Sequence, residues 1–550
     1  MLLWHLCKQK QPSSPQAIKY TAILAMIFSF SVFCQEVDIS STLSTTGYVY
    51  ETEIEGGDAL QNEALVIKPS VVGSYSRRLL SASLAANHTR VIRGADIRPN
   101  DGGEVGGDSS NQNYTDLTYK SALTLIENSL FLTFNGGQNY RVINQQQAGF
   151  SDEVLNSDNL TKSRSNRAQL DFSIPNPVYF GFNLQSTYSK IQTGQSQEGK
   201  TGVNANNLGV SVKIFQGKYF RPINFDISAK YSDTSRGNFQ NLESTRVQGN
   251  FRFPVIKEIE FLITGRLDKN KTDQTGFINR PNIDTTSYGA GLTWTPSNER
   301  NLSLTYNQLE EGENQTKFLG LNLVWAFSKR TVLNFDYSKR FFGDSYNLDF
   351  KHSLKSLKTS ISYSEDLTTF SRLSASNDYT SGIFVCEFGS TELIDCFQPG
   401  SLDYQLQAGE EFRTNTEIVT DISEEVILRK SGTASIGYDK RKIKMSIDAS
   451  YRRTEYLESG RQSTNRSLRF NVSYAIGRKT NISFASNIAK RQFNQLEAVD
   501  TTITSSIDFR RNLGRYLNMN IAARVLDRES VKLELNGSDK RLTFGLNYRF

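Results

Sequence analysis

Hydrophobic and polar residues alternate along most of this chain, and that period of two restricts the fold more than any other feature. The final segment shows the pattern, with Leu542, Phe544, Leu546, Tyr548 and Phe550 separated by polar or small residues. Side chains two residues apart share one face of a β-strand, so each such segment has an apolar face and a polar face. The pattern predicts an all-β protein.

Three features favour a membrane barrel over a soluble all-β protein, which is the alternative class. The alternating segments run about 9–14 residues, the length of a tilted membrane strand. Their polar face is rich in Asn, Ser, Asp and Arg, as a wet lumen requires. The connections alternate between short turns and long loops, which is typical of outer-membrane barrels. We therefore expect a large antiparallel transmembrane β-barrel in the outer membrane of a Gram-negative bacterium.

The alternating segments predict about 24 strands, within a range of 22 to 26. They are expected to begin near residues 37, 62, 79, 113, 130, 166, 178, 202, 222, 246, 259, 284, 302, 316, 331, 345, 357, 425, 443, 465, 480, 501, 517 and 540. An even count puts both chain ends on the periplasmic side, together with every short turn. Because the alternation of apolar and polar residues starts at Val37, we expect no plug domain before the barrel.

Composition excludes several other classes of protein. The mean hydropathy is −0.46, which is incompatible with repeated apolar runs of about 20 residues in a helical membrane protein. The chain has 11 prolines and 38 glycines, too few for a collagen-like chain or one disordered throughout. Only three histidines are present, which disfavours histidine-rich metal or acid–base chemistry.

Residues 1–34 have the pattern of a secretory signal peptide. Lys8, Lys10 and Lys19 precede or flank an apolar run over 21–33 that is too short to span a bilayer. We expect cleavage after Cys34, leaving a barrel over 35–550; lipidation of Cys34 and a retained anchor are the alternatives. Removing the three lysines lowers the net charge from +6 to +3, so no nucleic-acid partner is expected.

Cys386 and Cys396 are the two thiols of the expected mature chain, ten residues apart in a polar segment. An exported compartment favours a disulfide between them, with two unpaired thiols as the alternative. Both lie in the long connection 372–425, which also carries an acidic run. This connection is expected to be a plug, a lid over the lumen, or a solvated loop.

Function in such a barrel is expected to lie with polar side chains that face the lumen. Alternation places eight candidates there: Asn224, Asp226, Asn334, Asp336, Arg469, Asn518, Asn520 and Arg524. Their mixed charges and many amides suit a neutral, hydroxyl-rich solute such as a glycan, although a nonspecific pore would look similar. The closing residues Phe544, Leu546, Tyr548 and Phe550 are interpreted as a C-terminal insertion signal.

The sequence offers little for catalysis, and we expect no enzyme, no cofactor and no metal. His88 and His352 have no second ligand at zinc-type spacing, and adjacent His352 and Ser353 point to opposite faces of a strand. No nucleotide-binding loop or nucleophile elbow is present. The pair Gly289 and Gly291 is interpreted as packing against an aromatic ring.

Three segments carry a family resemblance. They are 424–453, which begins Glu-Glu-Val-Ile-Leu-Arg-Lys, the hairpin over 65–90, and the closing stretch 542–550. With these segments the chain resembles the outer-membrane β-barrel proteins of the PEP-CTERM/exosortase system, over nearly the whole mature length. The resemblance implies a role beside exopolysaccharide biosynthesis and export, and it supplies no catalytic residues.

The expected function is therefore a porin-like channel or export conduit, gated by 372–425. A non-conducting structural or docking barrel of the cell surface is the alternative. The expected partners are outer-membrane lipid and lipopolysaccharide, the barrel-assembly machinery, and polysaccharide or periplasmic export proteins.

Overall fold

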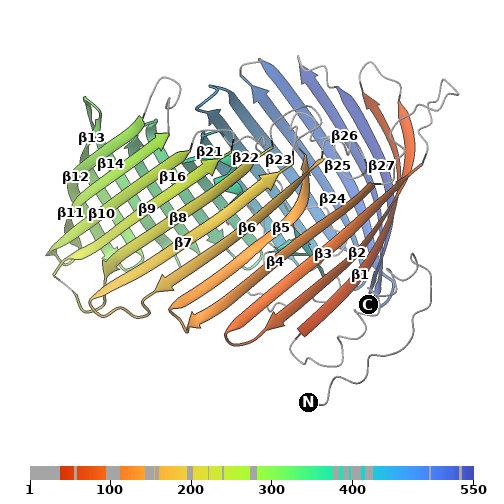
Figure 1. Cartoon of the computed structure of the whole chain (residues 1–550), viewed down its shortest axis with the longest axis horizontal. Coiled ribbons are helices and arrows are strands. Elements are labelled where there is room, and N and C mark those ends of the chain that lie inside the picture. The colour runs from red at the N-terminus through yellow and green to blue at the C-terminus, as the bar shows by residue number, and fades with distance from the viewer. Residues whose placement is uncertain are drawn as a thin grey trace.

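The computed structural model shows a closed β-barrel whose strands lean steeply across its wall (Figure 1). It describes residues 37–54, 59–94, 112–142, 154, 160–194, 202–220, 222–237, 241–272, 282–375, 383–387, 396–397, 410–414, 425–494, 497–531 and 536–550. The proposed signal peptide 1–34 lies outside the described residues. In the described part of the chain, no helix is long and apolar enough to cross a membrane.

One antiparallel sheet of 24 strands forms the wall of the described chain, and β1 pairs with both β2 and β27 to close the ring. Neighbours follow chain order except at β17, which pairs with β21. The barrel strands are β1 (Val37–Ile54), β2 (Leu60–Ser76), β3 (Leu80–Arg93), β4 (Gln112–Ile126), β5 (Leu130–Val142), β6 (Leu160–Ser173), β7 (Phe180–Thr193), β8 (Asn204–Gln216), β9 (Asn224–Arg236), β10 (Leu242–Ile256), β11 (Ile259–Thr272), β12 (Asn282–Ser297), β13 (Arg300–Glu311), β14 (Asn314–Ser328), β15 (Thr331–Arg340), β16 (Gly343–Ser353), β17 (Leu357–Thr368), β21 (Ile427–Lys440), β22 (Ile443–Tyr456), β23 (Gln462–Ala475), β24 (Thr480–Phe493), β25 (Ala498–Asn512), β26 (Leu517–Val531) and β27 (Gly537–Arg549). The predicted fold class and strand count are confirmed, and each predicted start lies within six residues of an observed one.

The outer face of the wall is apolar, as a lipid environment requires. On β27, Leu542, Phe544, Leu546 and Tyr548 are all exposed, and the residues between them face the interior. Direct partners across a pair of strands share a face, so the register carries this assignment around the ring. An apolar band outside and a polar interior place the barrel in the bacterial outer membrane. The role of these residues as an insertion signal stays a prediction.

Aromatic side chains mark the two edges of the apolar band. Trp294 and Trp325 face outward near the rim with the short turns, with ring centroids 5.6 Å apart. Tyr337 and Tyr346 pair near the opposite rim at 5.2 Å. Such rings sit at the membrane–water interfaces of outer-membrane barrels. We call the rim with the long connections the outer rim.

The connection between β17 and β21 contains secondary structure that the sequence did not predict. The helix α2 (Phe370–Ala375) follows β17 directly. A separate sheet contains β18 (Ile383–Glu387), β19 (Cys396–Phe397) and β20 (Glu410–Thr414). Its backbone register pairs Cys386 with Cys396. Directly opposed residues of antiparallel strands lie at a separation that suits a disulfide, which stays a prediction.

The barrel turns a tight corner at β12–β14, at the left end in Figure 1, and glycines make it possible. A Cβ on Gly291 would overlap the carbonyl oxygen of Leu304, and one on Gly289 would overlap the side chain of Asn307. These glycines therefore face the interior against β13. The expected packing of Gly289 and Gly291 against an aromatic ring is wrong, because the corner leaves room there only for backbone and short polar groups.

The corner predicts unequal effects of two alanine substitutions. Gly291→Ala should destabilise the barrel by about 1–3 kcal/mol, the usual cost of overpacking. Gly265→Ala is the matched control, because a Cβ there meets nothing within 4 Å. Urea unfolding of both variants in detergent micelles, followed by gel mobility, measures the difference. Equal midpoints for the two variants would contradict this account of the corner.

Candidate functional site

The strand register places all eight predicted lumen residues on the interior face. Asn224 and Asp226 flank Phe225, whose direct partner Phe251 is exposed on the membrane face. Asn334 and Asp336 likewise flank Phe335 on β15. Arg469 on β23 is the partner of Asp448 and Asn487. On β26, Asn518, Asn520 and Arg524 are the partners of Asn547, Gly545 and Arg541.

The residues on β9 belong to a continuous polar network with β10 and β11. Asp226 accepts a hydrogen bond from Arg252 and another from Asn250, each 2.8 Å long. Asn250 in turn accepts a hydrogen bond from Thr264 at 2.9 Å. Mutual bonding of this kind reduces the number of buried polar groups that are left without a partner.

A second interior network surrounds Asp268 of β11. Arg246 and Arg266 donate to its two carboxylate oxygens at 2.6 and 2.7 Å. Arg340 of β15 lies 3.8 Å from the same carboxylate. Because β15 is not a neighbour of β11, this contact spans part of the interior. The three arginines therefore hold this side of the barrel narrow.

The segment after β17 crosses the interior near the outer rim. In α2, the Arg372 guanidinium donates to the Thr234 hydroxyl of β9 at 2.6 Å. It also donates to Ser244 at 3.2 Å and to the Leu242 carbonyl at 2.9 Å on β10. Thr234 and Ser244 face inward by register. Since β17 is seven strands from β10 around the ring, α2 must bridge the lumen to reach them.

Short-range contacts fix the orientation of α2. The Thr369 hydroxyl accepts from the Arg372 amide at 3.3 Å, which caps the first turn. Ser371 donates to Asn207 of β8 at 3.1 Å. On the opposite side, Leu373 packs with Ile427 and Tyr456 of β21 and β22. The helix thus contacts two facing walls at once.

The ends of distant hairpins meet around the same point. Arg236, at the end of β9, forms a 2.8 Å ion pair with Glu458 in the turn between β22 and β23. The Arg236 side chain is fully buried. Beside it, four residues from the ends of three strand pairs form an apolar cluster: Leu242, Phe341, Leu367 and Val426. We call α2, this ion pair and this cluster the outer constriction.

The outer constriction divides the outer end of the barrel into two lobes. The narrow lobe has ten strands, β10–β17, β21 and β22, and the wide lobe has the other fourteen. A further contact narrows the wide lobe, because Arg93 donates to the carbonyl of Val154 at 2.9 Å. Val154 packs on inward-facing side chains of β1–β4, including Tyr50 and Tyr114. Both sets of contacts therefore narrow the interior at its outer end.

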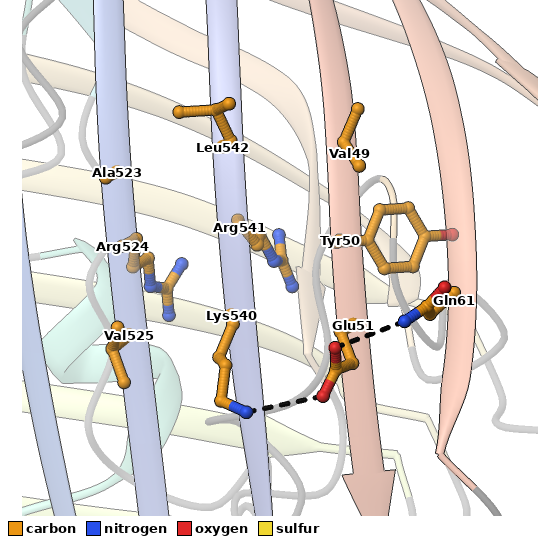
Figure 2. A pocket seen from close by; sticks show the side chains of 10 residues that line it. All are labelled: Val49, Tyr50, Glu51, Gln61, Ala523, Arg524, Val525, Lys540, Arg541 and Leu542. Carbon is orange, nitrogen blue, oxygen red and sulfur yellow. Dashed lines mark hydrogen bonds and ion pairs between the residues drawn. The ribbon is translucent and has the colours of Figure 1, made fainter.

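A shallow pocket of about 450 Å³ lies where the barrel closes, over β26, β27, β1 and β2 (Figure 2). Lys540 lies 3.3 Å from Glu51, which also accepts from Gln61 at 3.3 Å. Val49 and Leu542 are exposed on the same outward face. On the outward side Lys540, Glu51 and Gln61 already pair with one another. The lining also includes the inward-facing residues Arg524 and Arg541.

The two histidines among the described residues each form a local hydrogen bond. His88 and His352 each bond through Nδ1 to a threonine on the neighbouring strand, at 2.9 and 2.7 Å. Their register places both on the outward face, away from the lumen. Among the described residues, no group of three or more His, Cys, Asp and Glu could hold a metal ion.

Comparisons with known proteins add structural likeness only. No protein-family model and no curated protein matches the chain. Two similar solved structures are the FrpB iron transporter from Neisseria meningitidis and the siderophore receptor PirA from Acinetobacter baumannii. The first has a TM-score of 0.44 and 9% identity, covering 94% of this chain and 83% of that one. The second has a TM-score of 0.43 and 10% identity, covering 94% and 81%. At these values the likeness carries no argument about function.

The Arg236–Glu458 pair tests the outer constriction. Arg236→Glu and Glu458→Arg should each destabilise the barrel by about 3–5 kcal/mol, since each leaves a buried charge against its like. The double exchange should recover a large part of the loss. Denaturant unfolding of all four proteins measures the coupling energy.

The exposed pair Arg78–Glu127, at 2.5 Å in two short turns, is the matched control. Reversing either charge of this control pair should change the free energy of unfolding by about 1 kcal/mol or less. A coupling at 236 and 458 no larger than in this control would show that the two hairpins do not meet.

Proposed function

We propose that the protein is a passive conduit through the outer membrane, gated by the segment 369–426. The observation that carries this proposal is the course of α2 across the interior, held by Arg372. A barrel of 24 strands is too wide for its own side chains to fill, so it contains either water or a plug. The polar interior wall supplies a hydrated path, and α2 lies across its outer end.

The chemistry of the interior supports passive movement down a gradient. The wall offers hydroxyl, amide and charged groups already bonded to one another, such as Asp226 with Asn250 and Arg252. Many weak contacts with such a wall replace the water molecules that hydrate a passing solute. Within the proposal, energy comes from the solute gradient or from machinery in the inner membrane.

The resemblance to the PEP-CTERM/exosortase barrels supports a more specific proposal. By that resemblance, the conduit serves export of exopolysaccharide or sorted surface proteins. Its partners would then be lipopolysaccharide in the outer leaflet, the barrel-assembly machinery, and periplasmic export proteins. A deletion strain tests this role, since it should retain polysaccharide in the periplasm; normal surface polysaccharide would contradict it.

A non-conducting docking barrel is the second candidate, and the outer constriction favours it. Arg236–Glu458, the apolar cluster and α2 together close part of the outer opening, which suits a rigid platform for surface material. The two candidates differ in whether removing α2 opens a path for ions.

The conduit predicts a rise in conductance when the gate is removed. Thr368 and Ile427 are direct partners across β17 and β21, so an Asn-Gly turn could replace 369–426 without opening the wall. We expect small or brief openings from the intact protein in a planar bilayer. The turn variant should give large, steady steps.

The conductance of Arg372→Ala should lie between those of the intact protein and the turn variant. This substitution removes the bonds from α2 to β9 and β10 but keeps the segment. Arg478→Ala, in a short turn at the other rim, is the control and should match the intact protein. Absence of conductance from every variant, with correct folding shown by circular dichroism, would contradict the conduit and support the docking barrel.

A further inference from the structure

We infer that the solute is a multiply charged anion, and that the interior wall formed by β23–β27 is the surface along which it moves. This inference rests on the proposed conduit and names its substrate class. It departs from the neutral solute expected from eight lumen residues, because the register now identifies the whole interior face.

The wall of β23–β27 carries a clear excess of positive charge. By register, the described residues of these five strands turn seven arginines and three aspartates toward the interior. Two arginines are held by aspartates. Arg528 donates to both oxygens of Asp500 at 2.8 and 3.0 Å, and Arg541 donates to Asp539 at 2.6 Å. The other residues in this count are Arg469, Arg491, Arg510, Arg524, Arg549 and Asp508, and Arg469 lies opposite Asp448 of β22.

The narrow lobe provides an internal comparison. Its ten strands turn nine basic and eight acidic described residues inward, so its interior is nearly neutral. There the arginines share carboxylates, as Arg246 and Arg266 do with Asp268. The positive excess on β23–β27 is therefore not shared by the narrow lobe.

Two arginines on this wall face each other directly. Arg524 of β26 and Arg541 of β27 are register partners, and Figure 2 shows them side by side on neighbouring strands. Like charges directly opposite each other repel across an antiparallel pair, and at Arg541 the bond to Asp539 offsets part of this repulsion. An anion between or above them would reverse the sign of the interaction. Guanidinium groups bind carboxylate, sulfate and phosphate oxygens in pairs, which suits this arrangement.

The other arginines extend this pair along the wall. Ser506 is the β25 partner of Arg524, and Arg510 lies four residues farther along the same strand. At about 3.3 Å per residue, this is a step of about 13 Å toward the rim with the short turns. Arg549 lies near that rim, and Arg491 lies toward the outer rim. Charges at such intervals suit a chain that carries repeated negative groups.

The test uses the channel in which an Asn-Gly turn replaces 369–426. In a gradient of potassium chloride, the reversal potential should show that chloride permeates faster than potassium. The double variant Arg524→Gln/Arg541→Gln should reduce the permeability ratio by about half or more, because a charged wall concentrates counter-ions. Arg510→Gln is a second variant that leaves the Asp539 contact intact and should act in the same direction. Lys351→Gln/Lys358→Gln removes two charges from the narrow lobe and should have a smaller effect.

Binding of linear polyphosphate to the intact protein in detergent gives a readout that does not depend on conductance. The intact protein should bind it, more weakly as salt rises, and Arg524→Gln/Arg541→Gln should weaken binding about fivefold or more. Lys351→Gln/Lys358→Gln should bind as the intact protein does.

The outcomes separate the two proposals. A conducting channel without anion preference, and polyphosphate binding that is equal in both double variants, would overturn the anionic substrate and leave the conduit standing. Silent channels with binding that depends on Arg524 and Arg541 would overturn the conduit and keep the anion-binding wall.

Discussion

In the hydrocarbon core of a membrane, each backbone N–H and C=O group needs a partner within the protein, and the pairing of β1 with β27 completes that requirement here. Thirteen residue pairs join these strands, from Thr42 with Arg549 to Ile54 with Gly537. Closure removes the two free edges of the sheet, so the whole wall can face lipid. The same closure fixes which residues face inward, since one register runs around the ring. The polar interior is thus a consequence of closure combined with strict alternation.

The interior is shaped by polar contacts between strands that are distant around the ring. Arg340 approaches Asp268, Arg372 bonds to β9 and β10, and Arg236 meets Glu458. Each contact places a guanidinium among groups that would otherwise be hydrated. Such contacts stabilise the fold most where water is excluded. Two of the three, those of Arg372 and Arg236, belong to the outer constriction. The result is a wall that stays polar throughout and a lumen that narrows toward the outside.

The local alternation of apolar and polar residues was enough to predict the strands of the barrel wall. Each strand shows this alternation by itself, and each short turn is marked by polar residues. The closing segment around Phe544 and Leu546 is predictable in this way without knowledge of any partner strand. The outer constriction is different. Arg372 and its acceptor Thr234 are 138 residues apart, and neither residue differs in kind from other polar residues of the chain. The charge excess on β23–β27 became visible only when register assigned every arginine to a face.

The central claim is that hairpin ends from opposite sides of the ring meet at the outer constriction. Crosslinking tests it directly, using cysteines at positions 236 and 458 in a chain whose other cysteines are serine. A bismaleimide about as long as an Arg–Glu contact should join 236 to 458 in the folded protein. It should not join 236 to a cysteine at 528, which lies on the far side of the wide lobe. Failure to join 236 to 458, with both thiols reactive, would contradict the account.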